Sequence, residues 1–529
     1  MGNWPIVYVR GYAGPTSGIN VQVEDPFYGF NAGSTHIRVA GDGVPAFYQF
    51  EGPLVRLIGD EQYKVYVHGS QERLLDDPAP EKALDQASLW IYRFYDQAAT
   101  TFQAPPHQNL VERLITRGRQ AVTADGFNIE DAAAGLYDFI MKIRTRTGAQ
   151  KVYLVAHSMG GLIARCMIQK KCQQDGRLAA RDIVAKFYTY GTPHGGIRSA
   201  GGVAQWIEAT FSPAGSDIFA PEKMQGYLDP AKHFGDDCDP GWDPQVMDDT
   251  LFPLDDIFCL IGTDPADYGW GPRTAMGPQT DGLVHIANAY VRGAHRAYVY
   301  KSHSGAYGEV NSEEGYQNLR RFLFGRWAVE AALAGVQLPT EAGTSWQMDM
   351  RLAIRGLSVV MSEQSTEHWC PIMLANGVTT LARTFLLDPA DHPDDTAVAD
   401  RQMRYTVTLR LFRVRDANGV FDFSNSSEQV PLWSDALIVD VQPGQGNALV
   451  AHAVWNSAVP GASQNPASLA DQLPPGVEAP LAFQVEGGAL VASVALPGAV
   501  VQTGLLGEGA SIRMTVSPRP VPEPAGPAG

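Results

Sequence analysis

The feature that most constrains the fold is the stretch "YLVAHSMGGLIARCM", residues 153–167. An apolar run of strand length ends at His157 and Ser158, and a helical pattern begins at once with two glycines. The small residues Ala156 and Gly160 on either side of the serine allow a strand and a helix to approach closely at a sharp turn. Such a turn pushes the serine hydroxyl out above the carboxyl end of the strand. The pattern therefore predicts a nucleophile at Ser158, and a simple helix cap is the weaker interpretation.

The first 330 or so residues alternate between short apolar runs and helical patterns. Three helices are predicted: one at 128–148, one that starts directly after the stretch "AHSM", and one at 311–325. Asn128 and Gly148 are suitable as the N-cap and the stop of the helix at 128–148. Strands are predicted at "PIVYVRG", 88–96, "KVYLVAH", 183–191, 256–262 and 296–301. Apolar strands that alternate with helices are typical of a mostly parallel sheet covered on both faces.

Two long segments, 12–87 and 197–255, interrupt this alternation and are rich in Gly, Pro and Asp. Loops of this length inside a compact domain usually cover a functional site. In the second segment, Trp206, Ile207 and Phe211 share one face of a helical pattern. This amphipathic segment is a candidate lid that opens at a lipid surface, and an ordinary packed helix is the alternative.

The pattern changes after about residue 340, where apolar and polar residues alternate with a period of two, as in "WQMDMRLAIR". Period-two segments separated by turn signals, without a long helix, predict an antiparallel β-sandwich. We therefore expect a catalytic α/β domain at 1–335, a β-sandwich domain at 340–517 and a Pro-rich disordered tail at 518–529.

A nucleophilic serine needs a base, and the base needs an acid that orients it. In a strand–serine–helix fold these residues follow in the order Ser, Asp, His. His303 comes just after the last predicted strand and can reach back over Ser158, whereas His295 precedes that strand. Asp281, in "TDGLV", stands 22 residues before His303 and is the preferred acid. Asp264, which directly follows a predicted strand, is the alternative.

Two backbone N–H groups are expected to stabilise the oxyanion that forms during acyl transfer. The first belongs to Met159, at the start of the helix that follows the nucleophile. The second is expected from Tyr12 in "IVYVRGYAG", where Gly11 lets the backbone approach closely. A plain glycine turn is the other interpretation of Gly11.

The segments "IVYVRGYAG", "YLVAHSMGGLIAR", "YTYGTPHGG", "TDGLV" and "SHSG" make the first 330 or so residues similar to the α/β-hydrolases of the bacterial lipase type. The resemblance implies the α/β-hydrolase fold. It implies Ser158, Asp281 and His303 as a catalytic triad, with Met159 and Tyr12 as backbone donors.

The resemblance also implies that "GTPHGG" shapes the wall near the nucleophile. The elbow and wall residues are then His157, Gly160, Gly11, Thr192 and His194. The chain departs from the family pattern in two places: Arg10 stands where such lipases commonly have His, and no Asp follows His303 closely. Bound calcium is therefore not expected. The C-terminal domain resembles no family that we can name.

Composition narrows the possible partners. The formal net charge of −17 argues against nucleic acid, which requires a basic surface. The first residues lack the features of a signal peptide, which predicts a cytoplasmic protein, with export by a signal-independent route as the alternative. Five cysteines without a CxxC pair predict reduced thiols, although a Cys238–Cys259 disulfide is an alternative. The acidic run 236–243 lacks regular ligand spacing, so neither metal nor cofactor is expected.

These observations predict a serine carboxylic-ester hydrolase that acts on lipid esters, as a lipase or phospholipase. A short-chain esterase or an acyltransferase would use the same triad. A non-catalytic binding protein on a hydrolase scaffold and an exported antibacterial lipase effector are the remaining alternatives. The sequence indicates possible contact with a lipid surface, and it assigns no partner to the β-sandwich.

Overall fold

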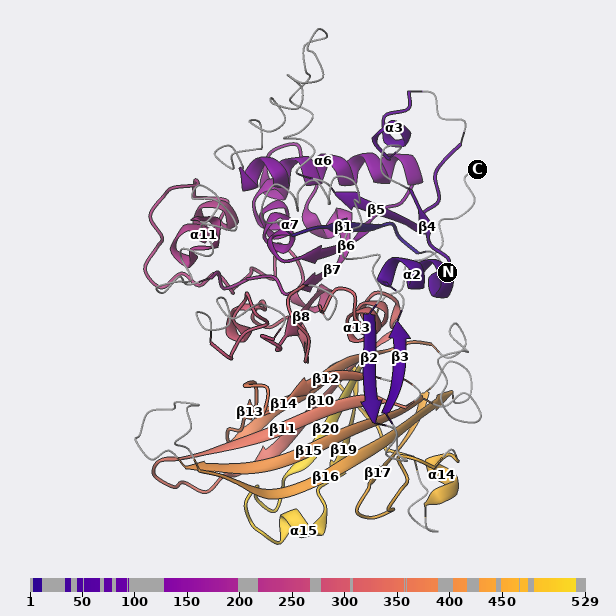
Figure 1. The fold of residues 1–529 in the computed structure, drawn as a ribbon, viewed down its shortest axis with the longest axis vertical. Coiled ribbons are helices and arrows are strands. Elements are labelled where there is room, and N and C mark those ends of the chain that lie inside the picture. The colour runs from indigo at the N-terminus through magenta and orange to yellow at the C-terminus, as the bar shows by residue number, and fades with distance from the viewer. Residues whose placement is uncertain are drawn as a thin grey trace.

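The structure is a computed structural model, and it contains an α/β part above a β-rich part (Figure 1). It describes the following residues, to which all structural statements below refer: 3–11, 34–39, 45–50, 52–66, 71–78, 82–92, 94, 128–197, 217–266, 277–304, 308–355, 357, 359–388, 403–415, 428–443, 449–465, 467–473 and 480–519.

The α/β part is built on a seven-stranded sheet whose neighbouring strands all pair in parallel, in the order β4-β5-β1-β6-β7-β8-β9. Its strands are β1 Ile6–Val9, β4 Lys64–Val65, β5 Ser88–Tyr92, β6 Val152–His157, β7 Val184–Tyr190, β8 Ile257–Gly262 and β9 His295–Val299. The chain order reverses beside β1, which pairs with both β5 and β6. In an open parallel sheet, ligands bind outside the carboxyl ends of the strands at such a switch point.

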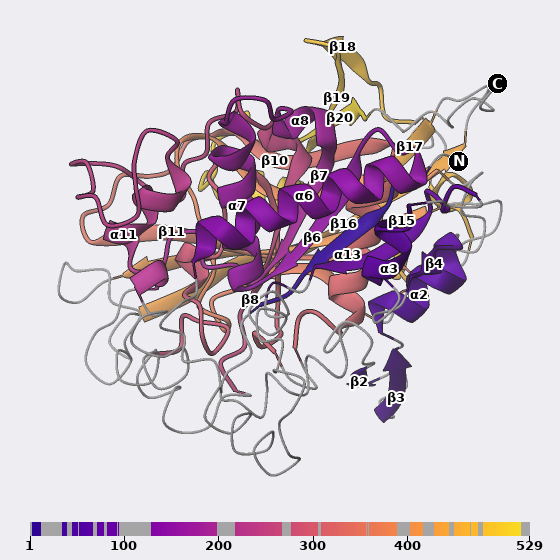
Figure 2. The same cartoon turned by 90° about the horizontal axis from the view of Figure 1, so that it is seen from above.

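Helices cover both faces of this sheet, as the apolar runs of its strands require. Helices α6 (Ile129–Thr147) and α7 (Met159–Gln169) lie over one face (Figure 2). Helices α2 (Pro53–Glu61) and α13 (Glu313–Phe324) pack with the side chains of the other face. The side chain of Asn128 caps α6 by accepting a hydrogen bond from the N–H of Glu130, and Gly148 ends the helix in the left-handed region. The sequence prediction of a parallel sheet between helices is confirmed.

The segment 12–87 contributes more to the fold than the predicted cover. Its described residues include helix α2, the short helix α3 (Gln71–Leu75) and the hairpin of β2 (Ser34–Val39) with β3 (Pro45–Phe50). They also include β4, which is the edge strand of the main sheet. Strand β4 has only two residues and lies within "YKVYVHG", a strand-like piece of this segment in the sequence.

The remaining elements of the α/β part are short. They are η2 Lys171–Gln173, α8 Ala180–Ile183, η3 Asp217–Phe219, α11 Pro221–Leu228, η4 Leu254–Asp256 and η5 Ile286–Asn288.

The β-rich part consists of two antiparallel sheets with a shared apolar core, as the β-sandwich prediction requires. The first sheet has the order β14-β10-β20-β19-β18, and the second has the order β12-β11-β15-β16-β17, with β13 beside β11. The strands are β10 Trp327–Val336, β11 Thr344–Ile354, β12 Val360–Gln364, β13 Ile372–Met373, β14 Gly377–Leu386, β15 Met403–Arg415, β16 Glu428–Pro443, β17 Leu449–Trp455, β18 Gln484–Glu486, β19 Ala489–Ala495 and β20 Ser511–Pro518. Two single-turn helices, α14 Leu469–Gln472 and α15 Gly498–Val501, lie in the connections.

Both predicted boundaries of the β-sandwich are shifted in the structure. The first strand of the sandwich begins at Trp327, whereas the catalytic domain was predicted to extend to residue 335. The predicted tail began at 518, yet Pro518 ends β20 and Arg519 is buried against Phe322 and Phe385. The side chain of Arg519 donates hydrogen bonds to acceptors on the α/β part. The proline-rich sequence around Arg519 did not predict this contact.

All five cysteines are free in the structure, and reduced thiols remain the prediction. Among the described helices, none combines the length and the apolar character needed to cross a membrane.

Candidate active site

The site is built around the turn between β6 and α7. Ser158 follows the last residue of β6 and precedes the first residue of α7, and its backbone has φ 54° and ψ −128°. A positive φ is strained for a serine, by about 1–3 kcal/mol, and persists only where the surrounding structure imposes it. Gly160 is part of this constraint, since a Cβ there would lie 2.4 Å from the carbonyl oxygen of Val9. The elbow geometry predicted from "AHSMGG" is thus present.

Ser158, His303 and Asp281 lie in one hydrogen-bonded row. The Oγ of Ser158 is 2.9 Å from Nε2 of His303, and Nδ1 of His303 is 2.8 Å from Oδ2 of Asp281. All three side chains are buried. Because a carboxylate only accepts, His303 carries its proton on Nδ1 in the neutral state, and its Nε2 accepts the serine hydroxyl proton.

Asp281 is held by the backbone on all sides. Its Oδ1 accepts hydrogen bonds from the N–H groups of Leu283 and Val284, at 2.9 and 2.6 Å. Its carbonyl oxygen accepts a bond from the backbone N–H of His303 at 2.9 Å, which fixes the two loops together. The competing acid, Asp264, instead accepts a bond from the N–H of Ala266 at 2.8 Å and forms no hydrogen bond with His303 among the described residues. The structure therefore brings Asp281 to the histidine, and it does not bring Asp264 there.

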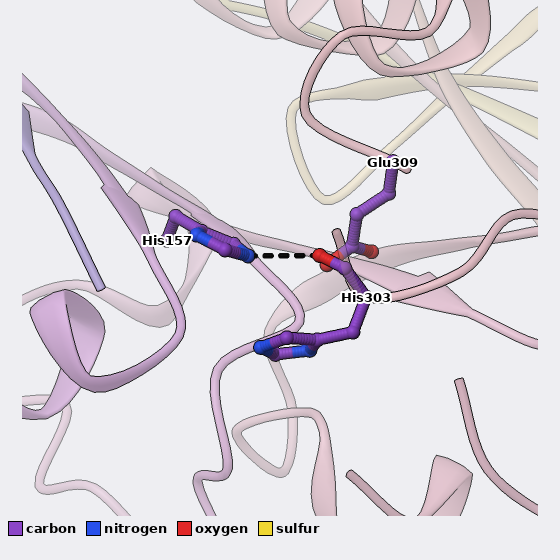
Figure 3. Close-up of side chains that lie close together, drawn as sticks. All are labelled: His157, His303 and Glu309. Carbon is purple, nitrogen blue, oxygen red and sulfur yellow. Dashed lines mark hydrogen bonds between the residues drawn. The ribbon is translucent and has the colours of Figure 1, made fainter. Parts of the chain in front are cut away.

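His157, next to the nucleophile, turns back to support His303. Its Nε2 lies 2.9 Å from the carbonyl oxygen of His303, and the two rings are 4.8 Å apart (Figure 3). Burial, together with the neighbouring His303, lowers the pKa of His157 to about 3. His157 is therefore neutral at ordinary pH, with its proton on Nε2, and donates to this carbonyl. Sequence reasoning placed His157 at the elbow without this contact.

Backbone donors for an oxyanion are expected beside Ser158. Met159 is the first residue of α7, and the first N–H groups of a helix have no acceptor within the helix. A Cβ on Gly11 would lie 2.8 Å from Cβ of Ser158, so the end of β1 passes directly beside the nucleophile. Tyr12, the expected second donor, lies outside the described residues, as do the candidate lid residues Trp206, Ile207 and Phe211.

The two residues of "GTPHGG" that were expected in the wall lie in the interior. Thr192 donates from Oγ1 to the carbonyl oxygen of Ser158 at 3.0 Å, which braces the elbow. His194 is fully buried, and its Nε2 lies 3.1 Å from Oγ1 of Thr189 in β7. Burial lowers the pKa of His194 well below its ordinary value, so it is neutral. His194 is thus a core residue that anchors the loop.

Glu309 is a site residue that sequence reasoning missed. It is fully buried, and its carboxyl group lies near His157 and His303 (Figure 3). One ligand atom of each of these three side chains lies within 4.8 Å of the others, which is close enough for a shared metal ion. However, Nε2 of His157 and both ring nitrogens of His303 already make hydrogen bonds. The only sequence signal was an acidic residue soon after His303 in "SHSGAYGEV".

The described cavity of about 860 Å³ is a separate feature. It lies between loops of the α/β part, including Trp242 and Tyr290, and the β12–β13 loop, including Trp369. Its lining contains none of Ser158, His303 and Asp281. The cavity is therefore not the candidate active site.

Comparison with protein families gives a match over part of the chain. The family described as "Putative serine esterase (DUF676)" matches residues 95–212, a range that contains the elbow at Ser158 but neither Asp281 nor His303. No curated protein matches the chain. Together with the parallel sheet and the elbow, the match agrees with the resemblance to α/β-hydrolases predicted from the sequence.

Several solved structures are distantly similar. The product of gene lin2722 from Listeria innocua is 14% identical, covers 61% of this chain and 94% of its own, and has a TM-score of 0.25. Phospholipase PlaB from Legionella pneumophila, in complex with thio-NAD, is 11% identical over 81% and 91% of the two chains, with a TM-score of 0.30. The Tle4–Tli4 complex gives 12% identity over 61% and 97%, with a TM-score of 0.23. Likenesses this weak carry no argument about the substrate of this chain.

Proposed function

We propose that this protein is a serine carboxylic-ester hydrolase that acts on lipid esters through an acyl-enzyme. The observation that carries the proposal is the row Ser158–His303–Asp281, with separations of 2.9 and 2.8 Å, on a strained strand–helix turn. An isolated serine hydroxyl is a weak nucleophile, and a histidine oriented by a carboxylate is the usual means of activating it.

The proposed reaction begins when Ser158 Oγ attacks the acyl carbonyl carbon and gives its proton to Nε2 of His303. Asp281 accepts the Nδ1–H of His303 throughout, which fixes the tautomer and stabilises the imidazolium. The N–H of Met159, with that of Tyr12 as the expected second donor, stabilises the oxyanion. The imidazolium then gives its proton to the leaving alcohol. Water repeats the same steps on the acyl-enzyme and releases the acid and free Ser158.

The lipid part of the proposal rests on the motifs that resemble bacterial lipases. A series of p-nitrophenyl esters from short to long acyl chains tests it. Hydrolysis that rises with chain length supports a lipase or phospholipase, and an optimum at short chains would make the protein an esterase. Added alcohols test the acyltransferase alternative, since an acyltransferase would form new esters in their presence.

The nucleophile is tested by labelling with a fluorophosphonate probe, which reacts with activated serines. We expect the intact protein to be labelled and the Ser158→Ala variant to remain unlabelled, with thermal unfolding used to check that the variant is folded. The matched control is Ser468→Ala, which removes a buried serine hydroxyl that caps α14 in the β-rich part by accepting a bond from the N–H of Asp471. Labelling that survives in Ser158→Ala, or none in the intact protein, would contradict the proposed function.

A further inference from the structure

The carboxyl group of Glu309 lies directly beside the Asp281–His303 pair. The position that a Cβ on Gly191 would occupy is 2.1 Å from Oε1 of Glu309, 2.8 Å from Nδ1 of His303 and 3.1 Å from Oδ2 of Asp281. These three atoms therefore surround one small space, which exists because residue 191 has no side chain. Gly191 also has a φ of 48°, in the region that favours glycine.

The backbone fixes Glu309 in this place from both sides. Its N–H donates to the carbonyl oxygen of Ser302 at 2.9 Å, next to His303 in the chain. Its carbonyl oxygen accepts from Oγ of Ser312 at 2.8 Å, and Ser312 is the N-cap of α13. The carboxyl group is thus built into the site by the same loop that carries the base, and it is not a mobile side chain at a surface.

The surroundings of this carboxyl group do not stabilise a charge. Among the described residues, no lysine or arginine forms an ion pair with it, and neither oxygen makes a hydrogen bond of ordinary geometry. The titratable groups that face it are Asp281, His303, His157, Tyr188 and Tyr190. None of these is a permanent cation.

Burial is the largest cause that raises the pKa of Glu309 well above its usual range, and the charge of Asp281 raises it further. A backbone contact from Gly262 offsets only part of this effect. An uncompensated carboxylate in such an environment takes up a proton in preference to remaining charged.

We propose that Glu309 is a positioning residue that acts as a neutral carboxylic acid, filling the space beside Asp281 and His303 and leaving Asp281 as the single anion that orients the base. A second carboxylate here would compete with Asp281 for the Nδ1–H of His303. It would also hold His303 as an imidazolium, which cannot accept the proton of Ser158. The kinetic part of this inference rests on the proposed function, whereas the neutral state of Glu309 does not.

The neutral state is tested by thermal unfolding of the wild type and Glu309→Gln between pH 5 and pH 8. In the unfolded chain a glutamate has a pKa of about 4.3, so above this pH unfolding of the wild type releases a proton from Glu309. The stability linked to this proton is complete below about pH 4.3 and is lost as pH rises towards the folded pKa. Glutamine has no such proton. We therefore expect the Tm of Glu309→Gln, relative to wild type, to rise steadily across this range.

The matched control is Glu61→Gln, which makes the same substitution at another buried glutamate. Glu61 is paired with Arg320 at 2.6 Å and lies on α2, so its loss breaks an ion pair. We expect this variant to have a lower Tm than wild type, without a gain as pH rises. A Tm difference between Glu309→Gln and wild type that stays constant across the range would overturn the neutral state.

The positioning role is tested by the pH profile of kcat/KM and by kcat for Glu309→Gln and Glu309→Ala. The alanine variant leaves room beside the pair, and a displacement of about 1 Å can lower kcat about 100-fold, with KM little changed. Glutamine should recover most of that loss. It should also leave the acid limb of the profile in place, since the charge beside His303 is unchanged.

Two results would overturn the positioning role. Equal losses of kcat in the alanine and glutamine variants would mean that the shape of the carboxyl group is irrelevant. A shift of the acid limb to lower pH in Glu309→Gln would mean that the wild-type residue is ionised. The expected Tm trend in a protein whose Ser158 is unreactive would support the neutral acid, while rejecting both the proposed function and the positioning role.

Discussion

The environment of each carboxyl group decides its chemical role at the residue scale. Asp281 is buried but accepts two backbone N–H bonds on Oδ1 and the histidine N–H on Oδ2, so its negative charge is well solvated by the protein. Glu309, close by, has no hydrogen bond of ordinary geometry to either oxygen among the described residues, and it faces Asp281. Two neighbouring acids thus have opposite expected charge states, because the described donors surround Asp281 and offset the burial of Glu309 only in part.

The choice of acid can be tested with Asp281→Asn and Asp264→Asn. The first variant removes the charge that orients His303 and favours the wrong tautomer, so we expect kcat to fall about 10⁴-fold with p-nitrophenyl esters. Asp264→Asn is a matched substitution at a partly exposed position that bonds to Ala266, so kcat should stay within about twofold. A large loss in Asp264→Asn, with Asp281→Asn active, would reverse the assignment.

At the scale of the elements, the strand–turn–helix unit places the backbone of α7 in close contact with the end of β1. Helix α7 begins one residue after β6 ends, and its first turn lies against the end of β1 at Val9 and Arg10. The missing side chain at Gly160 permits that contact, and Thr192 holds the turn from the next loop through its bond to the carbonyl oxygen of Ser158. The position of the nucleophile is therefore a property of packing between elements as well as of the turn itself.

Gly160→Ala tests this packing. The added methyl group would overlap the carbonyl oxygens of Val9 and Arg10, at 2.4 and 2.5 Å, so we expect a loss of about 1–3 kcal/mol in the free energy of unfolding. The control is Gly59→Ala in α2, where a Cβ meets nothing within 4 Å and the better helix propensity of alanine should stabilise by up to about 1 kcal/mol. Urea unfolding measures both, and equal stabilities for the two variants would refute the packing argument.

At the scale of the whole molecule, the β-sandwich is docked on the α/β part by specific bonds. The N–H of Tyr298 in β9 donates to Oγ of Ser362 at 3.2 Å, and the Nδ2 group of Asn318 in α13 donates to the carbonyl oxygen of Met361 at 2.8 Å. Phe385 of β14 packs in the same apolar cluster as α13. Because α13 also contacts the loop that carries Glu309, the sandwich supports the face of the sheet next to the site.

Arg519 fastens the end of the last strand to the α/β part. Its guanidinium donates to the carbonyl oxygen of Phe322 at 2.7 Å and lies over the rings of Phe322 and Phe385, and its side chain is only 7% exposed. We expect Arg519→Met to lower the free energy of unfolding by about 1–3 kcal/mol, because it removes a charged hydrogen-bond donor and its contacts with two aromatic rings from a largely buried position.

The control for this variant is Arg513→Met, which removes an ion pair with Glu486 that is largely exposed and should cost less than about 1 kcal/mol. Thermal unfolding compares the two. If the Arg513 variant lost as much stability as the Arg519 variant, the docking role of Arg519 would be wrong.

The sequence by itself determined the features that depend on local patterns. The period of its apolar residues predicted the parallel sheet, its helices and the antiparallel sheets that follow. The stretch around Ser158 predicted the elbow, because small residues and a reactive side chain must be neighbours in the chain to form it. The position of His303 after the last strand also predicted that it lies near Ser158, since the carboxyl ends of parallel strands meet at one edge of the sheet.

Only the tertiary structure decided the features that depend on which distant segments meet. The contacts of the two carboxyl groups showed that Asp281, and not Asp264, lies against His303. His194 lies in the core and not in the expected wall of the site. The tertiary structure assigned Trp327 to the sandwich and docked Arg519, because acceptors and partner strands far away in the chain determine both. It also placed Glu309 beside Asp281, and the space left by Gly191, more than a hundred residues away, is what makes that neighbourhood possible.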